Sequence, residues 1–319
     1  MLYFALIMSK KNNYFKHFLS IDSLSKHQIQ DIISVANGFF NQDGSIIQST
    51  ALQGKTIANL FFENSTRTKS TFELSAKKLS VNVLNVDINH SATSKGESLL
   101  DMILNLQAMQ VDAFVIRHPN AGAPLFVASQ LKNEAVIINA GDGSHSHPTQ
   151  AMLDIFTIWQ HKKDFQSLKI TIVGDILHSR VARSLIMALN IMQVGEIRVV
   201  APRTLMPSNT DVLGVHYYPD IDEALVDVDV IVMLRLQKER MNHAYIPSGS
   251  EFCHQYGLNE TRLKLAKKDA IVMHPGPTNR GVEIAPQIAD SPQSVILNQV
   301  TNGIVIRMAV MMMTMGADT

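Results

Sequence analysis

Short apolar runs that alternate with helix-period segments constrain the fold of this chain more than any other feature. Such runs are typical of parallel strands, which are buried on both faces. The alternation occurs in both halves of the chain and predicts an α/β fold of two doubly wound domains, each a parallel sheet flanked by helices. The predicted strands are Thr56–Phe62, Asn82–Val86, Ala113–Arg117, Ala135–Asn139, Lys169–Val173, Glu196–Ala201, Val228–Leu234 and Ala270–His274.

Helical periodicity fills the intervals between these runs. The polar stretch Ser20–Gly38 predicts a further helix near the N-terminus, with Ser23 or Ser25 as its cap. The other predicted helices are Thr71–Leu79, Ser98–Met109, Pro148–Gln160 and Arg180–Met192.

The domain junction is predicted where glycines and Pro148 interrupt the chain after the fourth strand. We expect a first domain over residues 1–148 and a second over 149–300, joined by interdomain helices, with a C-terminal helix over 301–319 that packs back on the first domain. No Gly/Ser-rich linker separates the halves, which favours a rigid helical connection.

Composition excludes several classes of protein. The chain of 319 residues has 28 basic and 28 acidic side chains, so its charge gives no case for binding nucleic acid or a membrane surface. A single cysteine, Cys253, excludes an intramolecular disulfide and a multi-thiolate metal site. We interpret it as a packing thiol rather than a nucleophile.

Neither end of the chain predicts a targeting signal. The apolar start Met1–Met8 lacks a preceding basic region and is too short for a signal peptide, so we expect a cytoplasmic protein. Met8 is a candidate for the true start. The apolar run Gly303–Met315 is interrupted by Arg307 and predicts a core helix.

Ser65-Thr66-Arg67-Thr68 follows a predicted strand and opens a helix. A helix N-terminus offers unpaired N–H groups and a positive dipole end, hydroxyls add donors, and an arginine can grip two phosphate oxygens. The motif therefore predicts an anion site, against the alternative of a capped helix with an exposed arginine. Lys95 and Arg117 can also meet an anion. Taken alone, Lys95 is better interpreted as a solvated surface lysine, whereas for Arg117 a structural ion pair is an equal alternative.

The segment 139–150 is the densest polar stretch and contains Asp142, His145 and His147. Its spacing matches no standard zinc pattern, so we predict no metal. We expect His147 to polarise a carbonyl and Gln150 to accept from an amide, with structural histidines as the alternative.

The second half carries cations at comparable places. Arg180 begins a predicted helix, while Arg235 and Gln237 follow a strand and share one face of an extended chain. No Gly-x-Gly-x-x-Gly fingerprint accompanies them. Gly276 and Pro277 lie in His-Pro-Gly-Pro, where prolines leave backbone carbonyls available as acceptors.

Taken in order along nearly the whole chain, these motifs resemble the carbamoyltransferases, and among them the catalytic chains of the aspartate-specific members. The ornithine-specific members are the rival, but they carry a His-Cys-Leu-Pro segment and a Ser-Met-Gly loop that this chain lacks. The resemblance implies transfer of a carbamoyl group from carbamoyl phosphate to L-aspartate, early in pyrimidine biosynthesis, without a cofactor. A non-catalytic protein that binds small anions and a nucleotide-dependent enzyme are the alternatives from other classes.

The resemblance also implies site residues. Arg67, Arg117 and His147 would be catalytic, through stabilisation of charge that develops on the phosphate and carbonyl oxygens. Carbamoyl phosphate would contact Ser65, Thr66, Arg67, Thr68, Arg117, His147, Gln150, Gly276 and Pro277. Aspartate would contact Lys95, Arg180, Arg235 and Gln237.

Further implications concern assembly. Lys95 would act in a neighbouring subunit's site within a homotrimer. Its loop is about two residues shorter than the family's commonest pattern, so Ser94 is not paired with the family's loop serine. Glu63 and Arg240 resemble residues that form interdomain ion pairs on closure. Regulatory chains or a dihydroorotase are possible partners.

Overall fold

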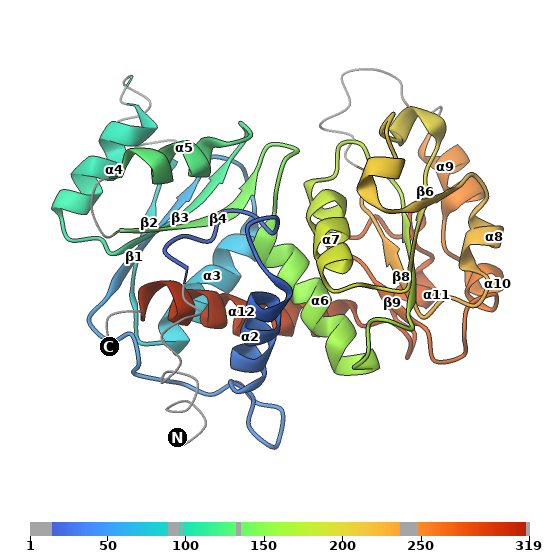
Figure 1. Ribbon diagram of the computed structural model, residues 1–319, viewed down its shortest axis with the longest axis horizontal. Helices are drawn as coiled ribbons and strands as arrows, with labels where there is room; N and C mark the ends of the chain where they lie inside the picture. The colour runs from blue at the N-terminus through green and yellow to red at the C-terminus, as the bar shows by residue number, and fades with distance from the viewer. Residues whose placement is uncertain (1–14, 89–95, 97, 132–134, 237–247, 317–319) are drawn as a thin grey trace. The chain divides into compact units, whose positions relative to one another are not determined.

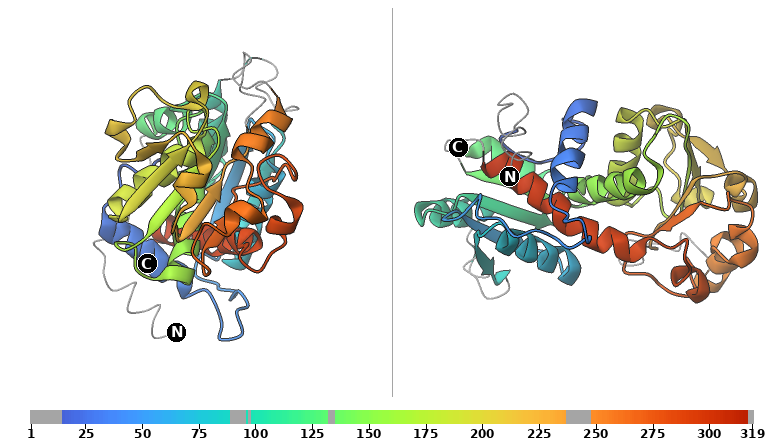
Figure 2. Two further views of the ribbon diagram at one scale, coloured as in Figure 1. Left: turned by 90° about the vertical axis from the view of Figure 1, so that its right-hand side faces the viewer. Right: turned by 90° about the horizontal axis from the view of Figure 1, so that it is seen from below.

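The computed structural model describes residues 15–88, 96, 98–131, 135–236 and 248–316. The chain divides into two compact units, one of Met1–Met152 with Asn302–Thr319 and one of Leu153–Thr301. Each contains a parallel sheet with helices packed against it, so the predicted fold is confirmed (Figures 1 and 2).

The sheet of the first unit has the order β2-β1-β3-β4, and all its pairings are parallel. The chain places β2 on one side of β1 and then returns to place β3 and β4 on the other. Before α6 the unit contains α2 (Lys26–Asn37), β1 (Thr56–Phe61), α3 (Thr66–Lys78), β2 (Asn82–Val86), α4 (Leu99–Ala108), β3 (Ala113–His118), α5 (Ala123–Gln130) and β4 (Val136–Asp142).

Apolar residues of β1 and β3 point alternately to the two faces of this sheet. Leu60, Phe114 and Ile116 are fully buried in a cluster with Ile103 of α4 and Val127 of α5. Because successive side chains point to opposite faces, one strand contributes residues to the cores on both sides of the sheet. The cluster fixes the strands whose C-terminal ends carry the predicted phosphate site.

The C-terminal helix α12 (Ile296–Met315) packs beside α3 in the first unit (Figures 1 and 2). The hydroxyl of Ser75 donates to the carbonyl of Ile304 over 2.9 Å, and the Arg307 guanidinium lies 4.9 Å from the ring centre of Phe72. By length and composition α12 could cross a membrane, but 67% of the apolar stretch is buried inside the structure. It therefore packs as a core helix.

The second unit has a five-stranded sheet of order β7-β6-β5-β8-β9, again with parallel pairings. The predicted strand Lys169–Val173 is found with those bounds, whereas β7 was not predicted because its three residues carry no apolar pattern. The elements are α6 (Pro148–Lys162, entered from the first unit), β5 (Lys169–Val173), α7 (Arg180–Ile191), β6 (Glu196–Val200), η3 (Arg203–Leu205), η4 (Asp211–Leu213), β7 (His216–Tyr218), α8 (Ile221–Leu225), β8 (Val230–Met233), α9 (Gly249–Tyr256), α10 (Glu260–Leu263), β9 (Ile271–Met273) and α11 (Pro286–Ala289).

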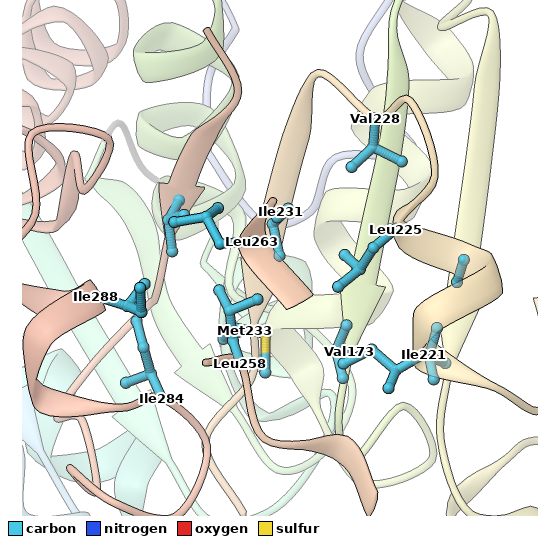
Figure 3. Close-up of a cluster of buried hydrophobic side chains, with 13 residues drawn as sticks. Val173, Ile221, Leu225, Val228, Ile231, Met233, Leu258, Leu263, Ile284 and Ile288 are labelled. Carbon is cyan, nitrogen blue, oxygen red and sulfur yellow. The ribbon is translucent and has the colours of Figure 1, made fainter. Parts of the chain in front are cut away.

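One core cluster of this unit joins the sheet to α8, α10 and α11 (Figure 3). Ile231 and Met233 of β8 pack there with Leu225, Leu263 and Ile288, all of them buried. Burial of such side chains supplies the main favourable free energy of the fold. It holds β8 in place between β5 and β9, directly before the loop that carries Arg235.

Candidate functional site

The phosphate motif lies where the first sheet reverses its strand order. β1 and β3 are neighbours, but the chain leaves them towards opposite sides of the sheet. In open α/β sheets ligands bind beyond the carboxyl ends of the strands at this switch point. Ser65 and Thr66 follow β1 there, and Arg117 lies within β3 opposite Phe61.

Helix α3 begins at Thr66, five residues before the predicted start, so that the motif forms its first turn. Ser65 occupies the cap position, yet its hydroxyl makes no capping bond. The hydroxyl of Thr71 donates to the carbonyls of Arg67 and Thr68 over 2.9 and 3.0 Å, which holds the turn in shape. The N–H groups of this turn face the end of the helix and favour an anion.

Arg117 connects the loop after β1 to strand β4. Its Nε lies 3.2 Å from Oε2 of Glu63, and its Nη1 donates to the carbonyl of Ala140 over 3.3 Å. The side chain is largely buried. Glu63 therefore pairs within its own unit here, while Arg240 lies outside the described residues and the predicted role of both in closure stays a prediction.

His147 and Gln150 enter from β4, the next strand of the same sheet. His147 immediately precedes α6, and its carbonyl accepts from the N–H groups of Gln150 and Ala151 over 3.0 and 3.2 Å. Both predicted ligand side chains are buried. Three adjacent strands thus bring the predicted carbamoyl phosphate residues of this unit to one edge of the sheet: Ser65, Thr66, Arg67, Thr68, Arg117, His147 and Gln150.

Asp142, which had raised the question of a metal, is a buried hydrogen-bond acceptor. It accepts from the N–H of Gly122 over 2.7 Å and from Nδ2 of Asn139 over 2.8 Å, and its Oδ2 lies 3.1 Å from Nδ1 of His145. Among the described residues no group of three or more His, Cys, Asp or Glu could hold a metal ion. Asp142 fixes the loop that leads to His147.

His118 is the last residue of β3 and directly follows Arg117. Its ring packs against Phe62 with centroids 4.9 Å apart, and Nδ1 accepts from the N–H of Asn120 over 3.0 Å. Burial lowers the pKa of His118 below its usual 6.5, against the opposing effect of the nearby negative charges of Glu63 and Asp142. The imidazole beside Arg117 is therefore neutral at pH 7.

The switch point of the second sheet lies between β5 and β8. Gly174 directly follows β5 and has a φ of 130°, and a Cβ there would lie 2.9 Å from Cβ of Leu234. Only glycine permits this close crossing of the two loops. One loop leads to Arg180, the buried first residue of α7, and the other to Arg235.

The acidic residues near this second switch point already bind donors of the protein. Asp175 is fully buried, and its carboxylate oxygens lie 3.0 and 3.1 Å from Nδ1 of His178. Glu283 accepts from backbone and side-chain N–H groups of Leu236 and Asn279. Arg180 and Arg235 follow strands at the same edge, and two arginines are a combination suited to a ligand with carboxylates.

The His-Pro-Gly-Pro segment follows β9 in the same sheet, with a cis peptide between Gly276 and Pro277. The N–H of Gly276 donates to Nδ1 of the buried His274 over 2.8 Å. Lys95 and Gln237 lie outside the described residues, so their predicted contacts stay predictions. Sequence reasoning missed Glu283, an isolated acidic residue that no motif singles out.

Family models cover most of the chain. The model described as aspartate/ornithine carbamoyltransferase, carbamoyl-P binding domain, matches residues 16–160, and the one described as the Asp/Orn binding domain matches residues 166–314. The chain belongs to the aspartate/ornithine carbamoyltransferase family. Within this family the phosphate motif and Arg117 fall in the carbamoyl-P binding domain, and Arg180 and Arg235 fall in the Asp/Orn binding domain.

Solved structures of aspartate transcarbamoylase from Trypanosoma cruzi are similar to this family member over almost their full length. One, in complex with N-(phosphonacetyl)-L-aspartic acid, is 30% identical with a TM-score of 0.84 and covers 95% of this chain and 97% of its own. A second, with carbamoyl phosphate and aspartate, has the same identity and TM-score and covers 95% and 98%. A third, with carbamoyl aspartate and phosphate, is 30% identical with a TM-score of 0.82 and covers 95% and 97%.

Proposed function

We propose that this carbamoyltransferase transfers the carbamoyl group of carbamoyl phosphate to the α-amino group of L-aspartate, giving N-carbamoyl-L-aspartate and phosphate. The choice of aspartate as the acceptor rests on one observation: Arg180 and Arg235 both lie beside the switch point of the second sheet. Two carboxylates need two cations, whereas the ammonium side chain of ornithine needs an acid. The acids there, Asp175 and Glu283, already bind donors of the protein.

Carbamoyl phosphate is assigned to the first unit. The opening turn of α3 would bind the phosphate through backbone N–H groups, hydroxyls and the Arg67 guanidinium. Arg117 and His147, from the next strands along the sheet, would bind nearer the carbonyl oxygen. Gln150 would accept from the carbamoyl NH₂, with the carbonyls beside Gly276 and Pro277 as further acceptors.

The reaction needs no covalent enzyme intermediate. The neutral amino group of aspartate attacks the carbonyl carbon, and a tetrahedral intermediate forms with negative charge on the carbonyl oxygen. The C–O bond to phosphate then breaks, and the phosphate takes the amine proton. Arg67 and Arg117 would stabilise charge on the leaving phosphate, and Arg117 and His147 charge on the carbonyl oxygen.

Assembly is part of the same proposal. Lys95 would complete the aspartate site of a neighbouring subunit, which requires a homotrimer. The enzyme would act in the cytoplasm in pyrimidine biosynthesis, with regulatory chains or a dihydroorotase as candidate partners. No cofactor is assigned, because attack by an amine on an activated carbamoyl group needs none.

A direct assay tests the proposal. Purified protein is incubated with carbamoyl phosphate and either L-aspartate or L-ornithine, and the carbamoylated product and phosphate are quantified together. Product from aspartate alone is expected. Product from ornithine alone would overturn the choice of acceptor, and binding of carbamoyl phosphate without turnover of either amino acid would indicate a non-catalytic anion-binding protein.

A further inference from the structure

Glu283 is a fully buried carboxylate in the second unit, beyond strand β9. Its Oε1 accepts from the backbone N–H of Leu236 over 3.0 Å and from Nδ2 of Asn279 over 2.6 Å. Its Oε2 accepts from the backbone N–H of Asn279 over 2.8 Å. Because burial penalises an ionised carboxylate strongly unless donors surround it, these three bonds stabilise the charged form.

The three donors belong to two different loops. Leu236 directly follows Arg235 in the loop after β8, and Asn279 lies two residues beyond Pro277 in the loop after β9. β8 and β9 are hydrogen-bonded neighbours, so both loops leave the same edge of the sheet. Glu283 therefore joins the loop of the proposed aspartate arginine to the loop of the proposed carbamoyl acceptors.

His274 extends this connection to the end of β9. Its Nδ1 accepts from the N–H of Gly276, which places the proton of a neutral imidazole on Nε2. Nε2 lies 3.9 Å from Oε2 of Glu283, and both side chains are buried. The backbone N–H of His274 in turn donates to Oε1 of Gln299 over 2.9 Å. The carboxylate thus faces the residue that orients Gly276.

We propose that Glu283 is a positioning residue that sets the place of Arg235 relative to the Gly276-Pro277 carbonyls. It contacts neither substrate; it acts through the backbone of Leu236 and through Asn279. This inference rests on the proposed function, because it assumes that these two loops bind the two reactants. The two loops must be held in a fixed relative position, since small displacements of the bound reactants cost much of the catalytic rate.

A second buried carboxylate in the same unit provides a matched control. Asp229 directly precedes β8, at the opposite end from Leu236. It accepts from the backbone N–H of Lys169 over 3.0 Å and from Nζ of Lys267 over 2.9 Å. Glu283→Gln and Asp229→Asn therefore each replace a buried, multiply bonded carboxylate by its amide, but only the first does so beside the proposed site.

The experiment measures kcat, both KM values and the melting temperature of the wild type and both variants. Glu283→Gln is expected to raise the KM for aspartate roughly tenfold, the change that one misplaced charged contact produces, and the KM for carbamoyl phosphate by a smaller factor. Asp229→Asn is expected to lower the melting temperature while both KM values stay within about twofold of wild type. Unchanged KM values in Glu283→Gln, or equal KM changes in the two variants, overturn the inference.

If Glu283→Gln does not fold, Asn279→Ala tests the inference instead. It removes the donor 2.6 Å from Oε1 and leaves the carboxylate in place, so a smaller rise in the aspartate KM is expected. An unchanged KM in that variant overturns the inference. Wild-type protein that makes no carbamoyl aspartate contradicts the proposed function instead, and the two failures are therefore distinguishable.

Discussion

The guanidinium of Arg117 and the carboxylate of Glu63 form an ion pair in the first unit, with Nε and Oε2 3.2 Å apart. Arg117 lies at the carboxyl end of β3, and Glu63 lies in the loop that leads to the phosphate motif. A phosphate at that motif would share this arginine with the acid. The pair therefore opposes binding of the anion by partly neutralising a cation of its site.

Replacement of Glu63 by glutamine should strengthen the binding of inorganic phosphate, by roughly threefold to tenfold, because Arg117 loses its competing partner. Isothermal titration calorimetry of the free enzyme measures this. Glu73→Gln is the control, since Glu73 pairs with Lys77 on the surface of α3. Weaker binding in Glu63→Gln would mean that the acid orients Arg117 for phosphate rather than competing with it.

Arg67→Ala should reduce kcat on the order of a hundredfold or more, because a preorganised donor to the leaving phosphate is lost. The fold should survive, since the core of the first unit lies elsewhere. Lys77→Ala removes a cation from the other end of the same helix and should leave turnover near normal. Near-normal turnover in Arg67→Ala would refute the phosphate assignment.

Arg235→Ala should raise the KM for aspartate by roughly two orders of magnitude, as expected for a lost arginine–carboxylate contact, with little change in the KM for carbamoyl phosphate. Initial rates over a wide range of aspartate concentrations test this. Arg203→Ala, which removes an exposed arginine of the same unit, should leave both constants unchanged. An aspartate dependence equal to wild type would exclude Arg235 from the site.

Mixing inactive Lys95→Ala and Arg67→Ala proteins should restore activity if neighbouring subunits share sites. In the proposed homotrimer, one interface of a mixed assembly can pair an intact Arg67 with an intact Lys95. Exchange is verified by native mass spectrometry with isotope-labelled subunits before the assay. Verified mixed trimers without recovered activity would contradict the sharing.

Stability should decrease as the pH falls below the ordinary histidine pKa of 6.5, in part because of His118. Its pKa is lowered in the folded protein, so the unfolded state binds more protons as the pH falls from 6.5 towards the folded-state pKa. The contribution is fully present above 6.5 and is lost through that window. Melting temperatures between about pH 5 and 8 should therefore vary less steeply in His118→Gln, and equal profiles would exclude this effect.

Much of the fold could be predicted because local signals agreed with the tertiary structure. The run Lys169–Val173 became β5 without change, and Ser25 caps α2 through a capping box as its sequence allows. The short strand β7 could not be predicted, since its three residues lie at the sheet edge without an apolar pattern. Strand β7 forms because the folded chain places these three residues beside β6, with which they pair.

Sequence by itself determined the chemistry available to this protein: two cycles of alternating strands and helices, a hydroxyl-and-arginine turn at a helix start, and arginines after strands of the second half. These features depend only on residue types and short spacings, so they can be recognised from the sequence alone. Only the tertiary structure decided which of these residues contact one another. The ion pair of Arg117 with Glu63, and the bond from the N–H of Leu236 to Glu283, each connect residues about fifty positions apart. Such contacts follow from strand order, and strand order is set by packing of the whole sheet rather than by any local segment.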